Sequence, residues 1–138
     1  MKLDFTSFDQ AINSFQEAIA KTEEFSDSED FTMLKCLKAG SIQNFEFTYE
    51  LAWKFMKRWL ENNLGNTYVD GVPRRELFRL ARENKLISDV DVWMEYHSVR
   101  NMTSHTYNFH VAEEVYAIAK QFLNDVENFL EELKKRND

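Results

Sequence analysis

The sequence predicts an all-α protein, an antiparallel bundle of four main helices with one additional short helix. Apolar residues recur at three- and four-residue steps through most of the chain, which is the period of an amphipathic helix. Only three glycines and one proline interrupt the 138 residues, so long helices are favoured. No stretch of any length alternates apolar and polar residues as a strand would. Helices of this length joined by short loops pack naturally as an antiparallel bundle.

The first two helices are expected over about 4–25 and 30–63. The acidic, serine-rich segment 26–30 breaks the apolar pattern between them and offers a cap for the second helix. Gly40 lies inside the second helix, where we expect a kink or a close helix crossing. Leu64-Gly65-Asn66 should end it. The first apolar stripe consists of Phe5, Phe8, Ile12, Phe15 and Ile19.

The second half of the chain begins with an expected loop that runs to Pro73. A short helix fits residues 73–84, because proline suits the first turn of a helix. Ser88 is expected to cap the next helix, which carries Trp93 and Tyr96 on its apolar side. A final helix is expected over about 109–135. The aromatic stripes of all these helices are expected to form the core.

Composition narrows the class of protein further. The length and the 16.5 kDa mass predict one domain, residues 1–138. A lone Cys36 excludes a disulfide framework and multi-cysteine metal sites. The chain shows neither a run long enough to span a membrane nor the pattern of a signal peptide, so we expect a cytoplasmic protein without membrane contact.

The charge of −7 disfavours a broadly basic nucleic-acid binder. It is uneven, however: residues 31–109 hold eleven basic and nine acidic side chains, a net charge of +2. The charge distribution therefore does not exclude a local anion-binding cleft in this middle segment.

The densest polar segment is 100–108, Arg-Asn-Met-Thr-Ser-His-Thr-Tyr-Asn. Arg100 can bind phosphate through two parallel hydrogen bonds, and His105 can move a proton near neutral pH. Residues five apart lie about 140° apart around an ideal helix. Arg100 and His105 would therefore converge only if the helix frays near Ser104 or a second copy of the chain contributes. The alternative is a helix end where His105 favours the dipole and Asn108 caps the next helix.

Three further patterns leave alternatives open. Glu46, Glu50 and Lys54 recur every four residues; they form either a partly buried acid–base pair or an exposed charge ladder. The basic residues between 74 and 85 line either a nucleotide or RNA path or a solvated face. The histidines at 97, 105 and 110 lack the spacing of a zinc pair, so we expect no metal and no cofactor.

Residues 41–57 and 100–108 resemble the nucleotidyltransferase substrate-binding proteins, small bacterial and archaeal proteins of the HEPN superfamily. The resemblance spans nearly the whole chain, including the helix at 75–87 and Trp93. It implies a four-helix up-and-down bundle that forms a homodimer. It also implies a partner, a separately encoded minimal nucleotidyltransferase that holds the nucleoside triphosphate and its metal.

The resemblance implies two functions, of which we favour the first. In the first, the chain is a helical subunit that binds the substrate or nucleotide of the transferase. The binding residues would be Arg100, Asn101, His105, Tyr107 and Glu50. In the second, it is a metal-independent endoribonuclease toxin. Arg100 would then clamp the scissile phosphate, His105 would act as general acid or base, and Asn101 would shape the cleft.

In this second function, the transferase would silence the toxin by transferring AMP to Tyr107. Any transferase activity must come from another chain, because Gly40-Ser41 is not followed by the spaced aspartates of a transferase motif. A third hypothesis is a structural bundle in which the 100–108 segment only caps helices.

Overall fold

A computed structural model of the chain describes residues 2–137, within which there are six α-helices and no strand. The all-α prediction is therefore confirmed. None of these helices is long and apolar enough to cross a membrane. In chain order the helices are α1 (Thr6–Glu24), α2 (Phe31–Leu64), α3 (Asn66–Val69), α4 (Arg74–Glu83), α5 (Val90–Arg100) and α6 (Phe109–Lys135), with a 3-10 turn η1 (Thr103–His105) before α6.

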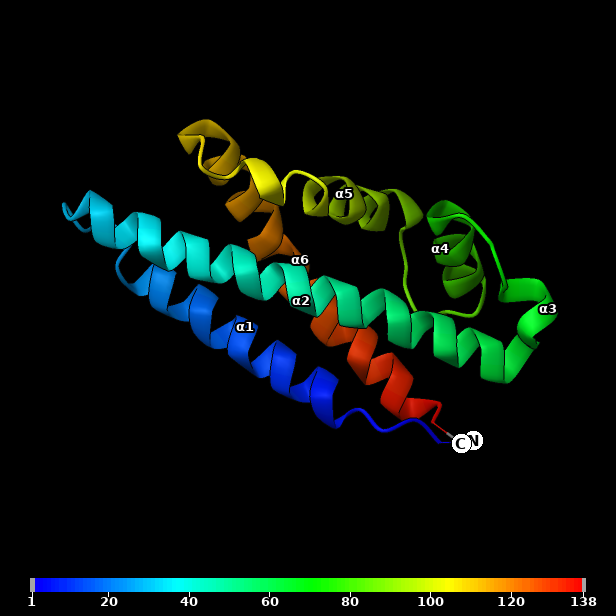
Figure 1. The fold of residues 1–138 in the computed structure, drawn as a ribbon. Coiled ribbons are helices and arrows are strands. Elements are labelled where there is room, and N and C mark those ends of the chain that lie inside the picture. The colour runs from blue at the N-terminus through cyan, green and yellow to red at the C-terminus, as the bar shows by residue number, and fades with distance from the viewer. Residues whose placement is uncertain (1, 138) are drawn as a thin grey trace.

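The helices α1, α2, α5 and α6 run alternately up and down, and α3 and α4 lie in the connection between α2 and α5 (Figure 1). The long α2 is the central element, because α1, α4, α5 and α6 all pack against it. The two described ends of the chain meet: Leu3 N donates to Asn137 Oδ1 at 2.8 Å, and Asn137 Nδ2 donates to Leu3 O at 3.0 Å.

The core is aromatic, as the apolar stripes predict. Phe122 of α6 is fully buried, and its ring lies 5.3 Å from Phe45, 4.8 Å from Tyr96 and 5.5 Å from Trp93 between ring centroids. Most of these contacts are edge-to-face, the arrangement that aromatic quadrupoles favour. The rings of α2, α5 and α6 thus pack against one another and hold α5 against α2. They also position the polar segment 100–108, called the motif below, which begins at the end of α5.

Helix caps agree with the sequence at two ends and differ at a third. Asp30 caps α2 by accepting from Met33 N at 3.1 Å, and Asn108 caps α6 by accepting from His110 N at 2.9 Å and Val111 N at 3.3 Å. Ser88 was expected to cap α5, but the cap is Asp89, whose carboxylate accepts from Val92 N at 3.1 Å. An aspartate caps at least as well as a serine and adds a favourable charge at the N-terminus.

Two expectations about glycine and the following loop need correction. A Cβ built on Gly40 would meet nothing within 4 Å, so the expected close crossing is absent and α2 continues through this position. Gly65 does end α2, with a φ of 94° that favours glycine. The loop expected between Asn63 and Pro73 contains the one-turn helix α3, which begins directly after Gly65 and buries Val69.

Candidate functional site

Arg100, the last residue of α5, is held against the middle of α2. Its Nε lies 3.3 Å from Glu50 Oε1, and its Nη1 lies 4.0 Å from Glu46 Oε2. Nη1 also donates to Thr103 Oγ1 at 3.1 Å, and that hydroxyl donates to the Arg100 carbonyl at 2.9 Å. The guanidinium side chain remains 31% exposed, so it is oriented by protein groups and still reaches solvent.

Glu46 and Glu50 of α2 face Arg100 and not Lys54. Glu50 also accepts from Trp53 Nε1 at 3.0 Å, which fixes its second oxygen. Lys54 is exposed and lies over the Trp53 ring at 5.8 Å. The charge ladder considered as an alternative is therefore replaced by a half-buried arginine between two carboxylates, a contact that periodicity along one helix does not reveal.

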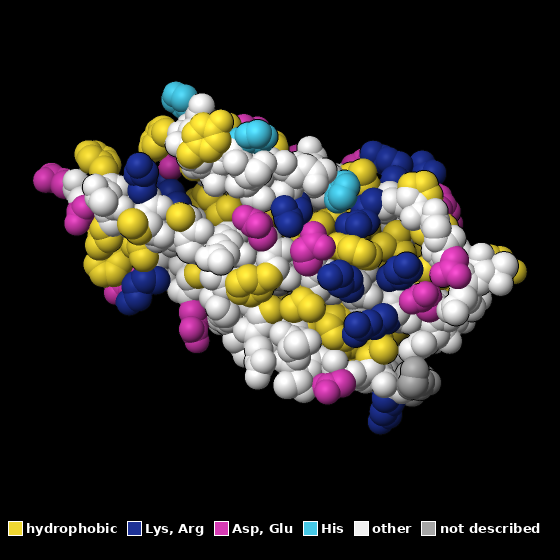
Figure 2. Space-filling model, viewed as in Figure 1, with side chains coloured by type: hydrophobic (Ala, Val, Ile, Leu, Met, Phe, Trp, Pro, Cys, Tyr) yellow, Lys and Arg dark blue, Asp and Glu magenta, His cyan; other side chains and the backbone are white. Residues whose placement is uncertain are grey.

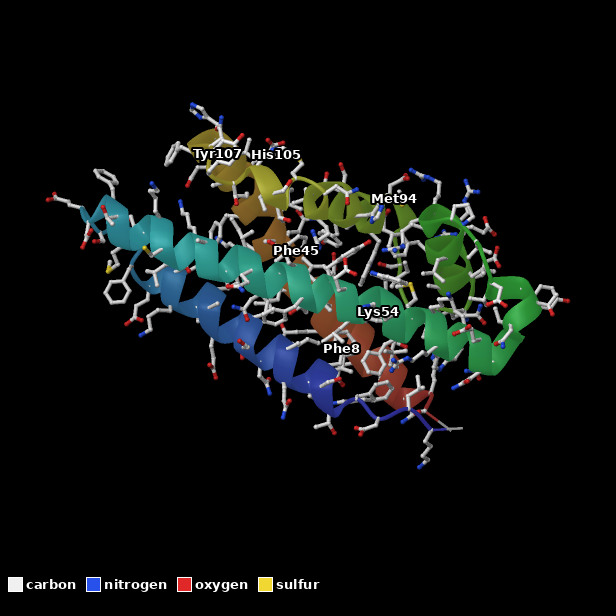
Figure 3. The ribbon with its side chains drawn as sticks, in the orientation of Figure 1. Phe8, Phe45, Lys54, Met94, His105 and Tyr107 are labelled. Carbon is white, nitrogen blue, oxygen red and sulfur yellow. The ribbon has the colours of Figure 1, made fainter. Side chains whose placement is uncertain are left out.

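His105 and Tyr107 lie beyond the end of α5, at the apex of the turn into α6 (Figure 3). Both are exposed, Tyr107 to 86%, and their rings lie 6.4 Å apart in an edge-on arrangement. Asn101 is exposed and forms the C-cap of α5, where its amide donates to the His97 and Ser98 carbonyls. Among the described residues, no hydrogen bond or ion pair joins the side chains of His105 and Arg100, so one chain by itself does not pair the two.

The reason is a change of backbone geometry between them. The helix ends at Arg100, ahead of the fraying point expected near Ser104, and the chain passes through the tighter η1 turn. The 140° separation of an ideal helix therefore does not apply to this pair, and the structure points Arg100 at α2 and displays His105 to solvent.

A second polar cluster lies one turn before Arg100, and sequence reasoning missed it. The Tyr49 hydroxyl accepts from Arg74 Nη1 at 3.0 Å and lies 2.9 Å from His97 Nδ1. The Arg74 guanidinium stacks on Trp53 at 3.9 Å. The residues come from three helices and share no local pattern, so only the tertiary structure assembles them.

Burial controls the protonation of this cluster. It raises the pKa of Tyr49 to about 12, against the opposing effect of the Arg74 charge. Burial, and then the neighbouring Arg74 charge, lower the pKa of His97 below its usual value. Near neutral pH, both side chains are therefore held uncharged and act as hydrogen-bonding groups.

The basic residues of α4 divide into two groups: Arg75, Arg79 and Arg82 line one pocket together with the carboxylates of Glu83, Asp89 and Asp91, and Arg74 lies outside it. Arg75 pairs with Asp91 at 3.0 Å and Arg79 with Glu76 at 3.6 Å, whereas Arg82 is exposed. Only Arg74 turns toward α2. Within residues 2–137, no three His, Cys, Asp or Glu side chains gather as a metal site would require.

The end of the molecule that carries Tyr107 is unusually apolar on its surface. Phe31 is 77% exposed and Phe109 62%, and hydrophobic side chains gather at this end in Figure 2. They border a pocket of about 520 Å³ between the first turns of α2 and α6, which Leu34 and Tyr107 also line. Large exposed apolar surfaces of this kind mark interaction sites in soluble proteins.

Comparisons with known proteins agree with this architecture. Residues 3–135 match the family described as nucleotidyltransferase substrate binding protein like. The chain is 35% identical, over 99% of its length and 95% of the relative's, to a Haemophilus influenzae protein named probable ribonuclease HepT.

Solved structures give the same result. HI0074 from Haemophilus influenzae, described as having the fold of a substrate binding domain of a nucleotidyltransferase, superposes with a TM-score of 0.88 at 32% identity, covering 95% of this chain and 99% of that one. A protein from Thermus thermophilus superposes with a TM-score of 0.64 at 27% identity, covering 86% and 98%. The chain therefore belongs to the nucleotidyltransferase substrate-binding protein family.

Proposed function

We propose that the chain is a metal-independent endoribonuclease whose active groups are Arg100 and His105. The observation that carries the proposal is the 35% identity, over nearly the full length of both chains, to a protein named probable ribonuclease. This relation reverses the order that we favoured from the sequence, where a binding-only subunit came first. The arrangement of the 100–107 segment supplies the chemical groups that such an activity needs.

Arg100 would bind the scissile phosphate. Its guanidinium is oriented by Glu50 and Thr103 and is still about one-third exposed. A guanidinium offers two parallel N–H donors to phosphate oxygens, and Asn101 beside it would shape the cleft. Glu46, at 4.0 Å, holds Arg100 only loosely, so a phosphate could displace that contact while Glu50 keeps the side chain in position.

His105 would transfer protons. As a general base, it would take the proton of the ribose 2′-hydroxyl as that oxygen attacks phosphorus and the bond to the 5′-oxygen breaks. A second His105 would return a proton to the departing 5′-oxygen. Because the 2′-hydroxyl is the nucleophile, the reaction needs no metal ion.

Two copies of the chain would complete such a site. Within the described part of one chain, the side chains of Arg100 and His105 share no hydrogen bond or ion pair, and the exposed Phe31 and Phe109 leave an apolar surface beside the motif. We propose that a homodimer covers this surface and pairs the two motifs across a shared cleft.

RNA cleavage in EDTA tests this activity. Purified wild-type protein should cleave RNA, and His105→Ala should abolish cleavage while the protein stays folded. His110→Ala is the matched control, because His110 is also exposed and lies five residues away, outside the motif. Cleavage that survives His105→Ala, or that is lost equally in His110→Ala, would contradict the proposed role.

The second candidate is the binding subunit of a minimal nucleotidyltransferase. The family description and the description of HI0074 favour it. A folded dimer that cleaves no RNA but forms a stoichiometric complex with the transferase would support this function over the first.

Both candidates allow Tyr107 to accept AMP, because its side chain is 86% exposed. With the transferase, ATP and magnesium, wild-type protein should gain the mass of one AMP and lose ribonuclease activity. Tyr107→Phe should gain none. Tyr68→Phe is the control, since Tyr68 is 70% exposed and lies on α3. Labelling that is lost in Tyr68→Phe and kept in Tyr107→Phe would move the acceptor to α3.

A further inference from the structure

Four cations on one face of the molecule have no carboxylate partner among the described residues: Lys54, Lys57 and Arg58 of α2, and Arg74 of α4. Figure 2 shows Lys and Arg side chains gathered over the second half of α2, beside hydrophobic ones. The chain as a whole has a charge of −7. An unneutralised basic cluster on an acidic protein attracts anions locally.

A pocket of about 290 Å³ lies within this cluster, between α2, α4 and α5. We call it the α2–α4 pocket; Trp53, Lys57, Arg74 and His97 supply its polar and aromatic lining, and no carboxylate lines it. Its size is at the lower end of the range for small-ligand sites. The lining therefore suits a small anionic group.

The guanidinium in the α2–α4 pocket is fixed in place without being neutralised. Arg74 stacks on Trp53 at 3.9 Å, and its Nη1 donates to the Tyr49 hydroxyl at 3.0 Å. Neither contact supplies a negative charge. A planar cation that is already oriented loses less entropy on binding phosphate than a mobile lysine does.

His97 adds a neutral donor. Arginine has donors only, so the Tyr49 oxygen accepts from Arg74, and the Tyr49 O–H is left to donate to His97 Nδ1 at 2.9 Å. This assignment puts the imidazole proton on Nε2. The lowered pKa of His97 is consistent with a neutral ring. The α2–α4 pocket thus offers hydrogen-bond donors from Lys57, Arg74 and His97.

The α2–α4 pocket lies near the 100–107 motif, although neither Glu50 nor Arg100 lines it. Glu50 contacts Arg100 through one carboxylate oxygen and Trp53 through the other. His97 lies three residues before Arg100 on α5, and therefore on the same side of that helix. From Glu50 to Lys57, α2 rises about 11 Å, so a strand of a few nucleotides can reach from one to the other.

We propose that the α2–α4 pocket binds a phosphate of the RNA strand that flanks the bond on which Arg100 and His105 act. This inference rests on the proposed ribonuclease function and extends it with a substrate-binding site. The specific contacts are bidentate binding by Arg74, a charge contact from Lys57 and a neutral N–H from His97.

Binding of a 2′-O-methyl single-stranded RNA to the full chain tests the α2–α4 pocket independently of cleavage, because this RNA has no free 2′-hydroxyl to react. Fluorescence anisotropy should show about ten-fold weaker binding by Lys57→Gln, the loss expected for one charge-assisted hydrogen bond. The slope of log K against log salt concentration should also become shallower by about 0.7. Arg82→Gln is the matched control, because Arg82 is exposed, forms no ion pair among the described residues, and lies outside the pocket.

Arg82→Gln should bind within two-fold of wild type, and thermal melting should be unchanged in both variants. Equal affinities of Lys57→Gln and Arg82→Gln for the RNA would overturn the proposal. So would a Lys57→Gln variant that binds RNA normally and loses the transferase, since the pocket would then be a protein-docking site.

Cleavage assays separate this proposal from the function on which it rests. If wild type cleaves, Lys57→Gln should raise KM and leave kcat unchanged. If wild type binds RNA through Lys57 but does not cleave, the proposed activity fails and the α2–α4 pocket stands.

A titration with AMP, followed by the NMR signals of His97, tells a strand from a free nucleotide. If the α2–α4 pocket binds a phosphate of an RNA strand, AMP should bind far more weakly than RNA. AMP that binds as tightly as the RNA would overturn it.

Discussion

Glu50→Gln tests how strongly the carboxylates of α2 hold Arg100. Glu50 Oε1 lies 3.3 Å from Arg100 Nε, which corresponds to about 5 kcal/mol of Coulomb attraction at an effective dielectric constant of about 20. Both side chains are about one-third exposed, so solvent screening and desolvation remove most of this energy. We expect a net coupling of about 1–2 kcal/mol. Glutamine keeps an acceptor for Trp53, so the change removes charge and little else.

A double-mutant cycle with Arg100→Gln measures this coupling by urea denaturation, which isolates the pair from other effects of each change. The matched control is the cycle for Asp9 and Lys134. That pair is closer, at 3.0 Å, but more exposed, at 43% and 44%. It should give less than about 0.5 kcal/mol. If the control pair couples as strongly as Glu50 and Arg100, burial does not strengthen the Arg100 contact and the reasoning is refuted.

Two further predictions concern the core and the His97 cluster. Phe122→Ala should lower the free energy of unfolding by about 3–5 kcal/mol, because the ring is fully buried against other rings. The control is Tyr68→Ala, which should change it by less than about 0.5 kcal/mol, because Tyr68 is 70% exposed and lies outside the proposed dimer surface. Urea denaturation measures both. His97 has a pKa below its usual 6.5 in the folded state, so the unfolded chain binds more protons between the two pKa values and stability should fall as the pH drops below about 6.5. His97→Gln should flatten this part of the pH profile, and a profile that does not change would contradict the assignment.

Much of the fold could be predicted from the sequence because the signals for helices are local. The three- and four-residue apolar steps predict α1, α2, α5 and α6, and Asp30 and Asn108 were readable as caps because each bonds to amides only a few residues away. The errors of prediction were also local: the N-cap of α5 is Asp89 and not Ser88, and the helix α3 lies where a loop was expected. Single-turn elements depend on packing more than on pattern.

The candidate site, too, could be predicted only in part from the sequence. The sequence alone singled out Arg100, His105 and Tyr107, because their side-chain chemistry and close spacing are visible without a structure. Contacts between helices decided the rest. Glu50 contacts Arg100 across the α2–α5 interface, and Arg74 reaches Tyr49 from α4; the residues of each pair lie 50 and 25 positions apart in the chain. A periodic pattern along the sequence does not reveal such contacts, because they depend on how the helices pack around the aromatic core.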